Sequence, residues 1–177
     1  MDRPHRCAFV HVALIAIAVL PMVHCSEGPV AYQLDYDEMV MLDAEALAEA
    51  GMGEAYQALL PKLRQYVPEP AKVEEILDET VPSYSVRALG QVYEIFSPDL
   101  EDDEGQSWGR ATYAFFSIIN EQLAHSSHRF YAISGGNDLF GIFLTPAERE
   151  SAIRGIENKR DWPYIPTDQH PWYGELR

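Results

Sequence analysis

Hydrophobic residues in the first half of the chain recur at three- and four-residue spacing, which is the period of a helix that buries one face. Asp43 is a suitable N-cap for one such helix, and Gly51 and Gly53 interrupt or end it. A longer apolar stripe predicts a second helix, which Pro61 should kink or split. The stripe comprises Met52, Tyr56, Leu59, Leu60, Leu63 and Val67.

Three further segments carry helix patterns. Residues 71–79 place apolar side chains on one face, which predicts a short helix with an acidic back. Residues 107–123 are apolar around so much of their girth that a helix there should be covered on more than one side. Thr145-Pro146-Ala147-Glu148 combines an N-cap, a proline at the first helical position and the glutamate of a capping box, which predicts a helix to about residue 157.

Strand patterns occur between these helices. Residues 84–96 alternate between apolar and polar on either side of Gly90, which indicates two short strands or one bulged strand. Residues 130–134 and 139–144 are rich in strand formers and flank Gly135-Gly136-Asn137-Asp138, a loop typical of a hairpin. Because adjacent strands joined by tight turns pair antiparallel, we expect a single α+β domain with a small antiparallel sheet and helices packed on it.

The first 25 residues have the pattern of a removable secretory leader. Arg3 and Arg6 precede an apolar run over residues 7–23, and small and polar residues follow it. Cleavage after Cys25 would leave residues 26–177 as the mature domain, with a tail rich in proline and aromatic residues from about residue 161. Cys25 also resembles the lipidation site of bacterial lipoproteins, so lipidation stays open beside plain cleavage. Either way, we expect export to the periplasm and no membrane span after processing.

The charge balance narrows the class of partner. The 177-residue chain has a formal net charge of −15. Removing Arg3, Arg6 and Asp2 with the leader leaves 11 basic and 27 acidic residues, a charge near −16. A body this acidic repels phosphate backbones and anionic headgroups, so we expect no nucleic-acid partner and favour a basic protein.

The sequence carries no dense catalytic or cofactor motif. It lacks a P-loop, a Rossmann glycine pattern, a GxSxG elbow and an HExxH pair, and the body has no cysteine after Cys25. His125 and His128 could hold a metal with a carboxylate, but they equally suit the polar end of a helix. Asp99, Glu101 and Asp103 alternate as in a calcium loop, but no glutamate stands at the spacing that closes such a loop. We therefore expect no cofactor, no metal and no catalytic residue.

Three segments are candidate contact sites for a basic protein. The acidic loop after Pro98 suits lysine and arginine, although it could equally be a solvated loop. Aromatic residues of the tail could anchor an interface, although they could equally fold back over the sheet. The hairpin loop is the third segment. The candidate residues are Asp99, Glu101, Asp102, Asp103, Glu104, Asn137, Asp138, Trp162, Tyr164, Trp172 and Tyr173.

In its leader, acidic charge, size and α+β pattern, the chain resembles the periplasmic immunity proteins that neutralise secreted antibacterial toxins. The resemblance implies an inhibitor that binds one cognate toxin, a basic hydrolase of cell wall or lipid, and blocks its active site. A cell-envelope enzyme, or an accessory or structural lipoprotein, stays open as the alternative. A large pocket holding a buried carboxylate would favour an enzyme, and a flat or protruding acidic surface would favour an inhibitor.

Overall fold

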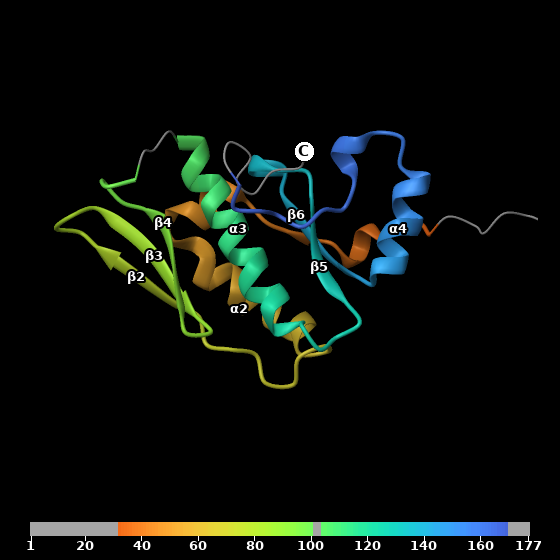
Figure 1. The fold of residues 1–177 in the computed structure, drawn as a ribbon, viewed down its shortest axis with the longest axis horizontal. Coiled ribbons are helices and arrows are strands. Elements are labelled where there is room, and N and C mark those ends of the chain that lie inside the picture. Colours follow the sequence, from red (N-terminus) through yellow and green to blue (C-terminus); the bar gives the residue numbers. More distant parts are fainter. Residues whose placement is uncertain (1–31, 101–103, 170–177) are drawn as a thin grey trace, which may run out of the picture. The chain divides into compact units, whose positions relative to one another are not determined.

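The computed structural model describes residues 32–100 and 104–169. The predicted leader and Cys25 lie outside this part. Six strands form two antiparallel three-stranded sheets (Figure 1). Sheet A has the order β1 (Val40–Met41), β6 (Phe140–Leu144), β5 (Arg129–Ile133), and sheet B has the order β2 (Glu74–Asp78), β3 (Ser83–Ala88), β4 (Gln91–Phe96). The expected single-domain α+β class is confirmed, with the strands divided between two small sheets.

Four α-helices accompany the sheets: α1 (Ala44–Ala46), α2 (Met52–Leu63), α3 (Glu104–Gln122) and α4 (Pro146–Gly155). Asp43 caps α1 through a hydrogen bond from the Ala46 N–H, as its position predicts. An irregular turn, Leu47–Gly51, interrupts the first helical stretch before α2 begins. The predicted capping box is present at the start of α4, where Thr145 and Glu148 exchange hydrogen bonds between side chain and backbone.

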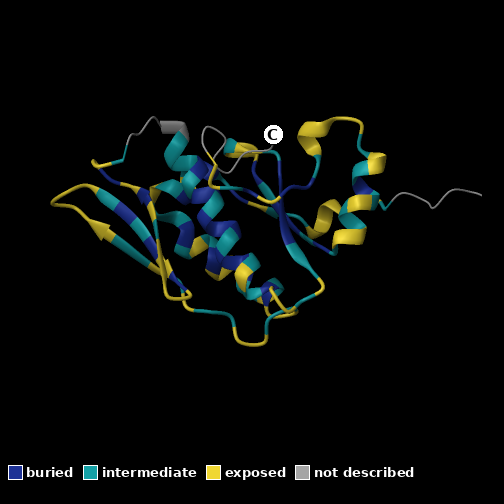
Figure 2. Cartoon of the chain, in the orientation of Figure 1, coloured by how far each residue is buried: buried dark blue, intermediate teal, exposed yellow. Residues whose placement is uncertain are grey.

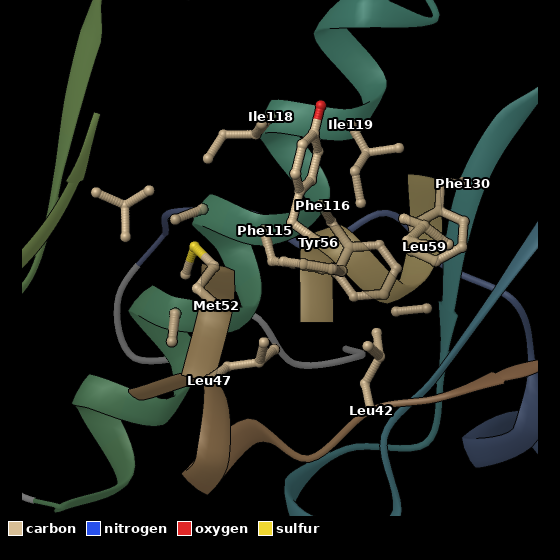
Figure 3. Close-up of a cluster of buried hydrophobic side chains, with 14 of the residues drawn as sticks. Leu42, Leu47, Met52, Tyr56, Leu59, Phe115, Phe116, Ile118, Ile119 and Phe130 are labelled. Atoms are coloured by element: carbon tan, nitrogen blue, oxygen red, sulfur yellow. The ribbon is translucent and has the colours of Figure 1, made fainter. Parts of the chain in front are cut away.

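The hydrophobic core surrounds α3, which contacts strands of both sheets as well as α1 and α2. Figure 3 shows side chains of α3, α2 and β5 gathered at the centre of this core. The prediction that this helix is covered on more than one side is confirmed, because both sheets and two helices contact it and its buried residues occupy more than half of its circumference. They include Ala111, Ala114, Phe115, Phe116, Ile118 and Ile119.

The β5 edge of sheet A is closed by contacts from two residues outside the sheet. Tyr164 forms an antiparallel bridge with Ala132, with N–H···O distances of 2.8 and 2.9 Å in the two directions. Two residues before Ala132, the Asn120 side chain binds the backbone of Phe130. It accepts a hydrogen bond from the Phe130 N–H at 2.9 Å and donates one to the Phe130 carbonyl at 2.8 Å. The backbone edge of β5 is therefore satisfied from outside the sheet, which blocks addition of another strand there.

One sequence prediction is wrong in this part of the chain, and one of the two outcomes predicted for Pro61 is excluded. Residues 71–79 contain strand β2 in place of the expected short helix, because every residue from Glu74 to Asp78 pairs with β3. The helix-like spacing of the apolar residues conceals this pairing, although β3 begins only five residues after Asp78. Pro61 does not split α2, which runs on to Leu63. Pro61 is exposed and near the end of the helix, so only a late backbone hydrogen bond is lost.

The two alternatives for residues 84–96 resolve into two strands. β3 and β4 pair over Tyr84–Ala88 with one irregularity in register between Tyr84 and Ser85. Their two-residue turn has positive φ at both positions, 53° at Leu89 and 78° at Gly90. Glycine suits this conformation, whereas leucine adopts it at a cost. Within the described residues, no helix has the length and apolar character needed to cross a membrane.

Candidate functional site

Sheet B is packed on one face only. Tyr84, Val86 and Ile95 point towards the core and are at most 4% exposed. The register places Glu74 and Val92 on either side of Arg87, with all three side chains on the opposite face. Among the described elements, the helices lie to one side of this sheet (Figure 1), and exposed residues run along β2 and β4 (Figure 2). The outer face of sheet B is therefore an open surface.

Acidic residues dominate this sheet and the segment after it. Residues 74–100 contain six acidic residues and one basic residue, Arg87. Arg87 Nη1 lies 3.6 Å from Glu74 Oε2, with both side chains about half exposed. An exposed pair of this kind contributes little to stability. Because Arg87 can balance only one carboxylate, the segment keeps a net charge of −5.

Two tyrosines tie the acidic strands to the rest of the domain. The Tyr84 hydroxyl donates to Glu75 Oε1 at 2.7 Å, and the Tyr93 hydroxyl donates to Glu121 Oε1 on α3 at 3.1 Å. Burial, and then the hydrogen bond to the neighbouring carboxylate, raises the pKa of each tyrosine well above its ordinary value. Both hydroxyls therefore stay protonated and act as fixed donors, which holds the sheet against the core.

The turn between β2 and β3 is held by one of the acidic residues. Asp78 Oδ1 accepts hydrogen bonds from the N–H groups of Thr80 at 2.8 Å and Val81 at 3.2 Å. These backbone hydrogen bonds, that from Val81 first, lower the pKa of the Asp78 carboxyl. The negative charge at this turn is therefore part of the turn's own structure.

Exposed hydrophobic side chains concentrate in the same segment. Of the eight large hydrophobic residues that are exposed in the described chain, five lie in sheet B or its turns. Single exposed hydrophobic residues are ordinary, but five in and around one small sheet are more typical of a contact region. Val92 lies on the open face, Leu77 lies on the same side of the sheet as Tyr84, and Val81 and Leu89 lie in the turns. The five are Leu77, Val81, Leu89, Val92 and Phe96.

The predicted acidic loop begins where sheet B ends. Asp99 is exposed three residues after β4, in a turn where the Leu100 N–H donates to the Ser97 carbonyl. Glu104 is the first residue of α3. Glu101, Asp102 and Asp103 lie outside the described residues. The structure thus joins Asp99 to the acidic strands, which the sequence analysis had not selected.

Four of the other predicted contact residues lie in the described part of the chain, in the turn of sheet A or in the segment after α4. Asn137 and Asp138 are exposed in the turn between β5 and β6, where Asn137 Nδ2 donates to Glu45 Oε2 at 3.3 Å. Tyr164 is only 4% exposed, and its hydroxyl donates to the Ser134 carbonyl at 2.8 Å. Trp162 is half-buried and its indole N–H donates to the Ile156 carbonyl at 3.0 Å.

The tail therefore follows the fold-back alternative as far as it is described. Tyr164 closes the edge of sheet A and has almost no surface left for a partner, which removes it from the candidate contacts. Trp172 and Tyr173 lie outside the described residues. The surface that sequence reasoning missed is the outer face of β2 and β4, because residues 71–79 were interpreted as a helix. The register of β2 places Glu74, Ile76 and Asp78 on that face.

Comparison with known proteins adds no relative to this picture. No family model matches the chain, and neither a curated protein nor a solved structure is significantly similar to it.

Proposed function

We propose that this chain is an exported inhibitor of the immunity type, which binds a basic toxin through sheet B and blocks its active site. The observation that carries the proposal is the combination, on one uncovered sheet, of exposed hydrophobic residues and unbalanced acidic residues. Such a surface suits a partner whose active site is ringed by lysine and arginine. The predicted leader supports the periplasm as the place of action.

The two kinds of residue would contribute differently to binding. Exposed carboxylates such as Glu94 and Asp99 attract a cationic partner over a distance and speed association, with an effect that falls as salt rises. Val92, 58% exposed on the outer face, would be desolvated in the complex and would slow dissociation. The proposal therefore predicts separable effects on the two rate constants.

The first experiment identifies the partner. The mature chain with a C-terminal tag serves as bait in lysate of its own cells, and the bound proteins are identified by mass spectrometry. A supporting result is one stoichiometric basic partner with hydrolase activity that equimolar mature chain abolishes. Absence of a stoichiometric partner at modest salt contradicts the proposal.

The second experiment tests the surface with matched charge reversals. Glu94→Lys with Asp99→Lys alters the sheet B surface, and Glu150→Lys with Glu157→Lys makes the same charge change at and after α4, which packs on sheet A. At low salt, the first pair should slow association about tenfold or more, and the second pair much less. Equal effects of both pairs would show that overall charge, and not sheet B, governs binding.

A further inference from the structure

A polar cavity of about 300 Å³ lies on the far side of the core from sheet B, between sheet A and the segments packed on it. It is formed by five separate stretches of chain, namely the entry segment before β1, the end of α2, the α3–β5 loop, β6 and the start of α4. Its volume is at the lower end of the range for ligand pockets. Any ligand must therefore be compact.

One wall of the cavity is a rigid aromatic stack. Tyr66 stacks on Phe143 with ring centroids 4.7 Å apart, and His128 lies against Tyr66 at 4.6 Å. Phe143 in turn packs against Phe130, which is completely buried. Because these rings support one another, the wall is preformed and offers apolar surface beside polar groups.

The rest of the lining is rich in acceptors and carries an excess of negative charge. Asp35, Glu38 and Glu148 provide three carboxylates, and Lys62 provides one ammonium. Lys62 Nζ donates to Glu38 Oε2 and to the Glu38 carbonyl, each at 2.8 Å. Lys62 and Glu38 therefore balance each other, and the charges of Asp35 and Glu148 remain.

Both remaining carboxylates are held in place by caps that use only one oxygen. Asp35 Oδ1 accepts from the Asp37 N–H at 3.0 Å. Glu148 Oε2 accepts from the backbone N–H and the hydroxyl of Thr145, each at 2.8 Å. No hydrogen bond within the described residues is found for the second oxygen of either carboxylate. Two fixed carboxylates thus each keep an acceptor for a ligand.

Burial and the carboxylates of the cavity both raise the pKa of its two tyrosines. Burial raises the pKa of the Tyr32 hydroxyl first, and the carboxylates of Glu148 and Asp35 raise it further. Burial likewise raises the pKa of the Tyr66 hydroxyl, with Glu38 and Glu148 adding to the effect and Lys62 opposing it. These shifts agree with a negative potential inside the cavity.

We propose that this cavity binds a compact organic cation, an ammonium or guanidinium group on a short alkyl stem. The cation donates hydrogen bonds to Asp35 and Glu148 while its stem lies along the Tyr66–Phe143 wall. A metal ion fits less well, since no group of three metal-ligating side chains occurs in the described residues. The inference concerns a different surface from sheet B and does not depend on the proposed toxin partner.

The experiment titrates the ¹⁵N-labelled mature chain with n-butylguanidinium chloride and n-butylammonium chloride and follows amide shifts by NMR. n-Butanol is the neutral control of similar shape. We expect saturable shifts confined to the cavity segments for both cations, with a dissociation constant on the order of 1 mM, and no such shifts for butanol. A capped Gly-Arg-Gly peptide distinguishes a free small cation from an arginine side chain of another protein. The peptide binds at the same residues only if a protein side chain can enter the cavity.

Matched variants test the two carboxylates. Asp35→Asn and Glu148→Gln remove charge but keep residue types that form the same caps, so the fold is retained. Each should weaken cation binding, up to about fivefold, and the double variant more. Asp43→Asn makes the same change at the cap of α1 and should leave binding unaltered. The proposal is overturned if the cations cause no saturable shifts, if butanol binds equally well, or if the double variant binds like the native chain.

Discussion

Gly141 provides a sharp test of how sheet A is packed against α3. It lies in β6 between Val40 of β1 and Ala132 of β5, where the ring of Phe130 covers it. A Cβ atom added at Gly141 would lie 2.6 Å from Phe130 Cε1 and 2.8 Å from Cε2, and closer still to Cζ. Distances this short require the ring or the backbone to move.

The ring has little freedom to move. Phe130 is completely buried, stacks on Phe116 with centroids 4.9 Å apart and packs against Phe143 at 4.6 Å. Overpacking of a well-filled core costs about 1–3 kcal/mol, whereas replacing glycine by alanine in an unhindered strand is favourable by about 0.5–1 kcal/mol. The difference between these two terms lowers the expected free energy of unfolding of Gly141→Ala by about 1 kcal/mol.

Urea unfolding followed by circular dichroism measures this change. Gly135→Ala is the matched control, because the nearest atom to its new Cβ is Tyr164 Oη at an ordinary 3.9 Å and its φ of −170° is extended. The control should stay within about 0.5 kcal/mol of the native chain.

A second variant separates the clash from other effects of the substitution. Phe130→Leu removes ring atoms that the new Cβ would meet, although it destabilises the native chain by leaving a cavity. In the Gly141→Ala background the cost of Phe130→Leu should largely vanish. The double variant should therefore be more stable than the sum of the two single changes predicts, by about 1 kcal/mol or more. Gly141→Ala within 0.5 kcal/mol of native, or strict additivity of the two changes, would refute the packing argument.

Three further predictions concern local hydrogen bonds. Thr145→Ala removes the hydroxyl that accepts from the Glu148 N–H and donates to Glu148 Oε2, and it should cost about 1 kcal/mol in urea unfolding, whereas Thr145→Ser should restore most of it. Asn120→Ala leaves the Phe130 N–H and carbonyl unpaired and should cost about 2 kcal/mol; a loss below 0.5 kcal/mol would contradict the edge-closing role. Because its folded pKa is lowered, Asp78 stabilises its turn above the unfolded pKa, and the turn loosens as pH falls through the folded value. The Val81 amide should thus titrate with a midpoint below 3.8, and a midpoint at or above 3.8 would contradict it.

The sequence predicts elements whose signals are local. The hairpin around Gly135-Gly136-Asn137-Asp138 and the capping box at Thr145 both form as expected, because turn residues and caps act within a few positions. The pattern of residues 71–79 was misleading although the strand that pairs with it is also close in sequence. Its apolar spacing fits a helix, and only pairing with β3 makes it a strand.

This error also explains why much of the candidate surface was missed. On a helix, Glu74, Glu75, Asp78 and Glu79 would form a solvated back. On a strand, alternate residues face opposite sides, so Glu75 reaches Tyr84 while Glu74 lies beside Arg87 on the open face. The sequence correctly directed attention to Asp99 but could not join it to an acidic sheet that it had not predicted.

The polar cavity was beyond sequence reasoning for a geometric reason. Its residues come from five stretches of chain, and no spacing pattern brings Asp35, Tyr66 and Glu148 together. His128, which was weighed as a metal ligand, proves to be part of the aromatic wall.

The closure of sheet A by Tyr164 has a consequence for the order in which the protein can be completed. Val40 begins β1, whereas Tyr164, which completes the opposite edge, follows every strand of sheet A in the sequence. During synthesis, the Ala132 edge of β5 therefore stays open until Tyr164 has been added. An open strand edge recruits other chains. A chain truncated just before Tyr164 should therefore aggregate more readily than the native chain.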